Sequence, residues 1–195
     1  MHREDLSPQV AALLDSASES LRNGDVDNAI IKYEKALQDL EMELDEYDTL
    51  LGKIYNELGY LYEVKGDIPN TLKYVEKESD YLQECEGEFS DVASLTFIHL
   101  AELYKMNDDL ASSELNYKKA LRNYTTSKGP KNENLPQVYF DLGAIYAEQG
   151  DKTKAKEYYE YAYADSVEIN GKDDEITQFI KEQLEQFLSL QHQKK

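Results

Sequence analysis

The sequence predicts an all-α protein built from four helix–turn–helix units and one further helix. The first observation is a period, because four dipeptides occur at intervals of 42 residues: Gly24-Asp25, Gly66-Asp67, Asp108-Asp109 and Gly150-Asp151. The second is that apolar and small residues recur at the same interval, and at separations of three and four within each unit. Such separations place side chains on one face of a helix, whereas a strand alternates its faces.

The first helix of each unit is predicted from three positions that share a place in the period. They hold a large residue, a small residue four positions later and, in all but the first unit, a Tyr three positions further on: Leu13, Ala17 and Ser20; Tyr55, Gly59 and Tyr62; Phe97, Ala101 and Tyr104; Tyr139, Gly143 and Tyr146. Small residues let two helices approach closely, and large ones fill the remaining space. We therefore expect these positions to pack the helices together.

The second helix of each unit follows the dipeptide and repeats a similar pattern: Ala29, Tyr33 and Ala36; Thr71, Val75 and Glu78; Ser113, Tyr117 and Ala120; Ala155, Tyr159 and Ala162. In the dipeptide, Gly can adopt the left-handed conformation that ends the first helix, and Asp can cap the N–H groups of the second. No Pro ends the second helices, so we expect them to run on for a turn or two. The positions where such a Pro would stand hold Glu41, Gln83, Thr125 and Val167.

These motifs resemble those of the tetratricopeptide repeat family. Tyr139-x2-Leu142-Gly143-x2-Tyr146, followed by Ala155-x3-Tyr159 and Ala162, is similar to the family's helix–turn–helix unit. The period of 42 residues resembles that of kinesin light chains and of some bacterial peptide-sensing proteins, although no Trp column is present. The resemblance implies an α-solenoid, coiled as a right-handed superhelix, that binds other proteins. It does not name the partner, because the family serves many unrelated ones.

The repeats divide the chain into a single domain, 1–195, with a capping helix at its end. The predicted boundaries are 10–51, 52–93, 94–135 and 136–177 for the repeats and 178–191 for the capping helix. The docking side of the first helix carries Ile54, Leu58 and Leu61; Thr96, Leu100 and Leu103; or Val138, Leu142 and Ile145, but in the first unit Ala12, Ser16 and Glu19.

In the last helix, apolar residues face the preceding repeat, whereas the opposite side is charged. Ile180, Leu184 and Phe187 are expected to dock, and Lys181 and Glu185 to stand where a further helix would pack. Since a repeat array needs polar outer faces at both ends, we expect the chain to be a complete protein with little besides the array.

Composition excludes several classes of partner. Forty acidic residues against 21 basic ones give a net charge of −19, and such a surface repels nucleic acids and anionic membranes. The single cysteine, Cys85, leaves no second thiol for a disulfide or a Cys-based zinc site. No apolar run is long enough to span a bilayer and no signal peptide is evident, so we expect an acidic protein in the cytoplasm.

No group of residues suggests catalysis. His2, His99 and His192 lie far apart in the chain, so neither a metal site nor a Ser-His-Asp triad can be assembled. The segment SKGPKNEN lacks the Gly-Lys-Ser/Thr ending of a phosphate-binding loop. We expect a protein that is not an enzyme and has no cofactor.

The resemblance implies that the first helix of every unit lines a concave groove. The groove position held by Leu14, Asn56, Ile98 and Phe140 is apolar in three units of four, where a solvated face should be polar. Family members that bind the C-terminal carboxylate of chaperones need basic and Asn residues where this chain has Leu14, Ser18, Glu57, Leu95 and His99, so that role is disfavoured.

The predicted function is to bind a segment of another protein, as a peptide or helix with an apolar anchor, in this groove. The predicted groove residues are Lys53, Asn56, Tyr60, Leu95, Ile98, Glu102, Lys105, Met106, Gln137 and Phe140. Two alternatives stay open. The protein could be a self-associating subunit, such as a homodimer, that uses the groove or its outer face. The apolar strip could also contact the second helices of the array itself.

Overall fold

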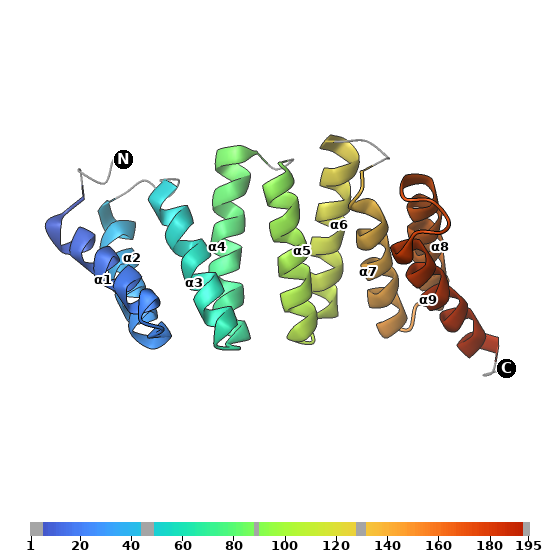
Figure 1. Ribbon diagram of the computed structural model, residues 1–195, viewed down its shortest axis with the longest axis horizontal. Coiled ribbons are helices and arrows are strands. Elements are labelled where there is room, and N and C mark those ends of the chain that lie inside the picture. Colours follow the sequence, from blue (N-terminus) through green and yellow to red (C-terminus); the bar gives the residue numbers. More distant parts are fainter. Residues whose placement is uncertain (1–5, 44–48, 88–89, 128–131, 193–195) are drawn as a thin grey trace. The chain divides into compact units, whose positions relative to one another are not determined.

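A computed structural model describes residues 6–43, 49–87, 90–127 and 132–192 of the chain. These residues form nine α-helices and no strand (Figure 1). The helices are α1 (Pro8–Arg22), α2 (Val26–Glu43), α3 (Thr49–Val64), α4 (Ile68–Glu86), α5 (Asp91–Met106), α6 (Leu110–Ser127), α7 (Leu135–Glu148), α8 (Lys152–Ile169) and α9 (Glu175–His192). The predicted all-α repeat fold is confirmed. So is the predicted extension of the second helices, since α2 runs to Glu43 and α8 to Ile169.

The contacts group the chain into two compact units, 1–88 with α1–α4 and 89–195 with α5–α9. Within each unit the helices pair as predicted, α1 with α2, α3 with α4, α5 with α6 and α7 with α8. The pairs are joined by packing of α2 on α3 in the first unit and of α6 on α7 in the second, where α9 packs on α8. The assignment of 1–195 to one domain stays a prediction.

The turn inside each helix pair has the conformation that the period predicts. Gly24, Gly66, Asp108 and Gly150 have φ of 76°, 70°, 61° and 81°, all in the left-handed region. The following aspartates cap the next helix, accepting a hydrogen bond from the backbone N–H three residues on at 3.2, 3.2, 3.0 and 3.1 Å in chain order. Hydrogen bonds from those residues hold the pKa of all four carboxyls below its ordinary value.

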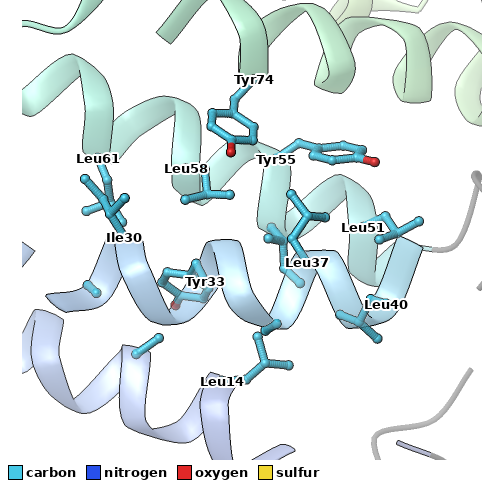
Figure 2. Packing of buried hydrophobic residues seen from close by; sticks show 14 of the residues in the cluster. Leu14, Ile30, Tyr33, Leu37, Leu40, Leu51, Tyr55, Leu58, Leu61 and Tyr74 are labelled. Carbon is cyan, nitrogen blue, oxygen red and sulfur yellow. The ribbon is translucent and has the colours of Figure 1, made fainter. Parts of the chain in front are cut away.

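The core of the first unit lies between α1, α2, α3 and the first turns of α4 (Figure 2). The docking residues Ile54, Leu58 and Leu61 are buried, whereas Ala12 and Glu19 of the first repeat are exposed, as their lack of a preceding repeat predicts. One prediction is wrong. Leu14, assigned to the groove, is only 8% exposed and belongs to this core, because the face of α1 that packs on α2 is broad enough to include it.

The core of the second unit extends from α5 to α9. Leu100, Leu103, Val138, Leu142 and Ile145 are buried in it. Ile180 of α9 is 1% exposed, and Leu184 and Phe187 pack against the same cluster.

The outer side of α9 is less polar than the sequence predicts. Lys181 and Glu185 lie there and form an ion pair at 3.8 Å. Ile176, Phe179 and Leu190 are also more than half exposed, although an end face of a repeat array is expected to be polar.

Two glycines are required where the paired helices cross closely. A Cβ on Gly143 in α7 would lie 2.8 Å from Cδ1 of Tyr159 in α8, and a Cβ on Gly52 in α3 would run into the ring of Tyr81 in α4. Contacts this short force a neighbour to move. Gly143 thus confirms the small position of the period, whereas the period did not single out Gly52.

Candidate interaction site

The predicted groove residues divide between the two units, and each part is described within its own unit. In the first unit α3 carries Lys53, Asn56 and Tyr60. In the second unit α5 carries Leu95, Ile98, Glu102, Lys105 and Met106, and α7 carries Gln137 and Phe140. The spacing of three and four along α5 puts its five residues on one face of that helix. Their role in binding stays a prediction.

In the first unit, Lys53 and Asn56 line a cleft of about 400 Å³ between α3 and α4. The cleft is narrow at its floor, because Gly52 brings α3 close to the ring of Tyr81. Asn56 Nδ2 donates a hydrogen bond to Glu78 Oε1 across it at 2.8 Å. Tyr60 lies further along α3, outside the lining, and is 61% exposed.

In the second unit, the apolar residues of the predicted groove fall into two classes. Leu95 and Met106 are 58% and 67% exposed. Ile98 and Phe140 pack against the core, and the Phe140 ring centroid lies 5.3 Å from that of Tyr159 and 5.6 Å from that of Phe179. The prediction that Ile98 and Phe140 lie outside the packed core is therefore wrong. Both contribute to the core because α8 and α9 bring aromatic rings to the side of α7 that the period left open.

Carboxylates gather between α5 and α7 beside these residues. Lys105 Nζ pairs with Glu148 Oε1 at 2.8 Å and so joins the two helices. Gln137 Nε2 donates to both carboxylate oxygens of Asp141, at 3.2 and 3.1 Å. Asp141 is partly buried and forms no ion pair within the part of the chain that the structure describes. We call Glu102, Asp141, Glu148 and Lys105 the Asp141 cluster.

The environment of Asp141 disfavours its charge. Burial raises the pKa of its carboxyl to about 6, and the hydrogen bond from Gln137 opposes this rise. The charge of Glu102 raises the pKa further, and that of Lys105 lowers it with the smallest of the four effects. Asp141 is thus a desolvated carboxylate that lacks a cation of its own at neutral pH.

Tyr117 reaches the same cluster from α6. Its side chain is 3% exposed, and no described residue hydrogen bonds to its hydroxyl. Burial raises the pKa of the hydroxyl, and the charges of Asp141, Glu102 and Glu148 raise it further, so the hydroxyl lies close to all three carboxylates. Sequence reasoning missed Asp141, Glu148 and Tyr117 as site residues. The polar residues 42 and 84 positions before Asp141, His99 and Glu57, were the available signal.

Other polar groups join neighbouring repeats instead of lining an open face. In the first unit Glu34 Oε1 accepts hydrogen bonds from the hydroxyls of Tyr62, at 2.8 Å, and Tyr74, at 2.9 Å. Burial, and after it the bond to Glu34, raises the pKa of Tyr62 to about 12. All the groups in this network have partners, so we assign it to packing.

The second unit has a corresponding network around Glu114. Its carboxylate accepts from Lys118, from the hydroxyl of Tyr146 at 2.8 Å and from Gln149 at 3.0 Å. Burial alone would raise the pKa of Glu114, but these three hydrogen bonds outweigh it and lower the pKa to about 2. This carboxylate is therefore satisfied within the fold, in contrast to Asp141.

Two kinds of site are not found in the described part of the chain. No group of three or more His, Cys, Asp or Glu side chains there could hold a metal ion. No helix formed by the described residues is both long and apolar enough to cross a membrane. The acidic side chains of the Asp141 cluster are thus not arranged as a metal centre.

Comparisons with known proteins agree with the repeat fold. Residues 90–165 match the tetratricopeptide repeat family. None of the curated proteins matches the sequence. One solved structure of a putative kinesin light chain from Podosopora anserina, with nearly identical TPR-like repeats, has a TM-score of 0.70 and 14% identity, covering 94% of this chain and 87% of that one.

Two further solved structures are similar. BtubC (BKLC) from P. vanneervenii has a TM-score of 0.59 and 21% identity, covering 90% of this chain and 78% of its own. MamA has a TM-score of 0.56 and 21% identity, covering 92% of each chain. At these identities the likeness concerns the fold alone. By its sequence over residues 90–165, and by its fold over the length that these structures cover, the chain is a tetratricopeptide repeat protein.

Proposed function

We propose that the chain is a non-catalytic interaction module, and that it binds a segment of a partner protein on the face of the second unit formed by α5 and α7. Folds of this kind generally serve as scaffolds for other proteins and are typically not catalytic. The observation that carries the proposal is that Leu95 and Met106, both more than half exposed, flank the Asp141 cluster on one helix face.

The spacing of the two exposed residues suits a short peptide. Eleven residues separate Leu95 from Met106 along α5, which corresponds to about 16 Å of helix axis. About five residues of an extended chain cover the same distance. Two apolar side chains of a bound segment could then cover Leu95 and Met106, each adding about 1.5–3 kcal/mol if fully buried.

The test begins with selection from a library of random 12-residue peptides on the full chain. The affinity of each selected peptide, hereafter the selected peptide, is then measured by fluorescence anisotropy. Replacing both Leu95→Glu and Met106→Glu should weaken binding by at least about tenfold, because interface energy concentrates in a few apolar anchors.

The matched control is Ile31→Glu with Leu115→Glu, which changes two side chains of similar exposure, 59% and 56%, on second helices. It should leave the affinity unchanged. Failure to select any peptide, or equal weakening by both pairs of changes, contradicts the proposal. Lys53 and Asn56 remain candidates for a second contact in the cleft of the first unit, which Lys53→Ala tests in the same assay.

Self-association is the second candidate, and α9 favours it. Ile176, Phe179 and Leu190 lie 55%, 51% and 53% exposed, and their spacing puts them near one stripe of the helix. Two copies related by a two-fold axis could bury this stripe on each other. Sedimentation equilibrium should then give a dimer mass that Ile176→Glu with Leu190→Glu reduces to that of a monomer. A monomer at all concentrations removes this candidate.

A further inference from the structure

The Asp141 cluster has more negative charge than its fold neutralises. Its three carboxylates face one ammonium group, and that group, on Lys105, already pairs with Glu148 at 2.8 Å. Asp141 receives only the amide hydrogen bonds of Gln137. Glu102 is exposed and has no ion pair in the described part of the chain, and its charge acts on Asp141.

We propose that the Asp141 cluster receives the side chain of a lysine or arginine from the bound segment, so that the partner's recognition element is a cation next to an apolar residue. The inference rests on the proposed function, whose site it makes specific. The cation would lie between Asp141 and Glu102, with Leu95 and Met106 covering the apolar neighbours along α5.

Charge complementarity is the first argument. A cation entering between Asp141 and Glu102 would give each carboxylate a partner and offset the unfavourable approach of two like charges. Because Asp141 is partly desolvated, its attraction to a cation is stronger than that of a carboxylate in open water. An anionic ligand is excluded by the same charges, and a metal ion by the lack of a suitable group among the described side chains.

Tyr117 is the second and independent argument. A hydroxyl on a side chain that is 97% buried is normally hydrogen bonded, yet no described residue bonds to this one. A lysine ammonium or arginine guanidinium is donor-only, so the phenol oxygen of Tyr117 can accept from it while the O–H donates to a carboxylate. The free hydroxyl therefore matches the geometry of a bound cation.

The occupant is a peptide side chain and not a free amine, because the cluster does not stand alone. Leu95 precedes Glu102 by two turns of α5, and Met106 follows it by one. A small amine would leave both apolar residues exposed, whereas a segment with an apolar residue beside its Lys or Arg covers at least one of them.

The test uses the selected peptides and their affinities for the full chain. We expect Lys or Arg to be enriched at one position, next to Leu, Ile, Phe or Met. Replacing that Lys by norleucine, or the Arg by citrulline, should weaken binding to the wild type about tenfold or more, as for a charge pair within an interface. Asp141→Asn and Glu102→Gln together should weaken the basic peptide by a similar factor.

A double-mutant cycle makes the pairing specific. The uncharged peptide should bind the Asp141→Asn/Glu102→Gln protein and the wild type equally, so that the two changes do not add. Tyr117→Phe should weaken the basic peptide several-fold and leave the uncharged one unchanged. Glu160→Gln removes one charge from an exposed position on α8 and is the control, expected to bind like the wild type.

The outcomes separate the inference from the function on which it rests. Peptides that bind at α5 but lack a basic residue, or additive effects of the two changes, overturn the inference and leave the proposed function standing. If no peptide is selected at all, both are contradicted. Competition by spermidine at the concentration of the peptide would assign the cluster to a free amine and also overturn the inference.

Discussion

The same position of the repeat is closed in the first unit and open in the second. Ser18 and Tyr33 in the first unit correspond to Glu102 and Tyr117, 84 residues later. The Ser18 hydroxyl lies 3.5 Å from that of Tyr33, so the pair forms a hydrogen bond within the fold. Glu102 and Tyr117 make no such bond in the described structure, and carboxylates surround them. The comparison teaches that the repeat specifies the packing, while residues between the packing positions decide where a ligand can bind.

The packing positions should be equivalent in the two units, and their loss should have the largest effect. Leu58 and Leu142, 84 residues apart, are both 0% exposed. Leu58→Ala and Leu142→Ala should each lower the free energy of unfolding by about 2–5 kcal/mol, because each leaves a cavity. Hydrogen exchange should show the loss in the mutated unit. An effect of less than about half a kcal/mol at either site contradicts the equivalence.

The close helix crossing should distinguish the units next. A Cβ on Gly143 would lie 2.8 Å from the ring of Tyr159, whereas a Cβ on Gly59 would lie 3.1 Å from Val75 Cγ2. Gly143→Ala should destabilise by about 1–3 kcal/mol through overpacking. Gly59→Ala should cost less, since a shift of a few tenths of an ångström suffices and Ala favours helix by about 1 kcal/mol. Urea unfolding of both variants checks the order, and the reverse order is the contradicting result.

Asp141 should destabilise the free protein at neutral pH. Its folded pKa of about 6 lies above the ordinary value of 3.8, so its contribution to stability is complete below pH 3.8 and is lost as the pH rises through 6. Asp141→Asn should therefore raise the free energy of unfolding at pH 7.5 by about 1–2 kcal/mol, a figure reduced for partial solvent exposure.

The gain should disappear at pH 4, where the carboxyl is largely protonated in the folded wild type. Charged and titratable groups face Asp141 from three neighbouring helices: Glu102 and Lys105 of α5, Tyr117 of α6 and Tyr159 of α8. Urea unfolding across this pH range measures the effect, with Glu160→Gln as the control. A loss of stability in Asp141→Asn at pH 7.5 would show that the carboxylate is satisfied after all.

The turns should give the smallest difference. Asp108 adopts φ of 61° where the equivalent Gly24, Gly66 and Gly150 have no Cβ. Asp108→Gly should stabilise the second unit by about 0.5–1 kcal/mol, since a residue with a Cβ is strained there. Gly66→Asp is the matched change in the first unit, where a Cβ meets no atom within 4 Å, so only the backbone strain should appear. Thermal unfolding of the two variants should move in opposite directions.

Much of the fold could be predicted from the sequence because period and capping are local signals. Gly150 and Asp151 announce a helix end and a helix start, and the structure has both. The limits of each buried face could not be predicted as well. Leu14 and Phe140 stand at the edge of the packing face, and whether such a residue is covered depends on the angle at which the next helix crosses.

The candidate site was predicted in part, for a related reason. Leu95 and Met106 were found from their spacing on α5, and they are exposed as expected. Asp141 and Tyr117 come together with Glu102 only because α6 and α7 bring them to α5, and a single sequence does not show such a meeting of helices. The exposed Ile176 and Phe179 were missed because the docking residues of α9 alone defined its expected orientation.

The three methionines of the chain allow the most direct test of the binding face. Met106 lies on α5, 67% exposed beside the Asp141 cluster, whereas Met42 lies on α2, 78% exposed. In protein labelled with ¹³C at the methionine methyl groups, titration with a selected basic peptide should shift the Met106 resonance until the site is saturated. The resonances of Met1 and Met42 should stay in place. A shift of Met42, or a Met106 resonance that does not move when the peptide is bound, would contradict binding at α5 and α7.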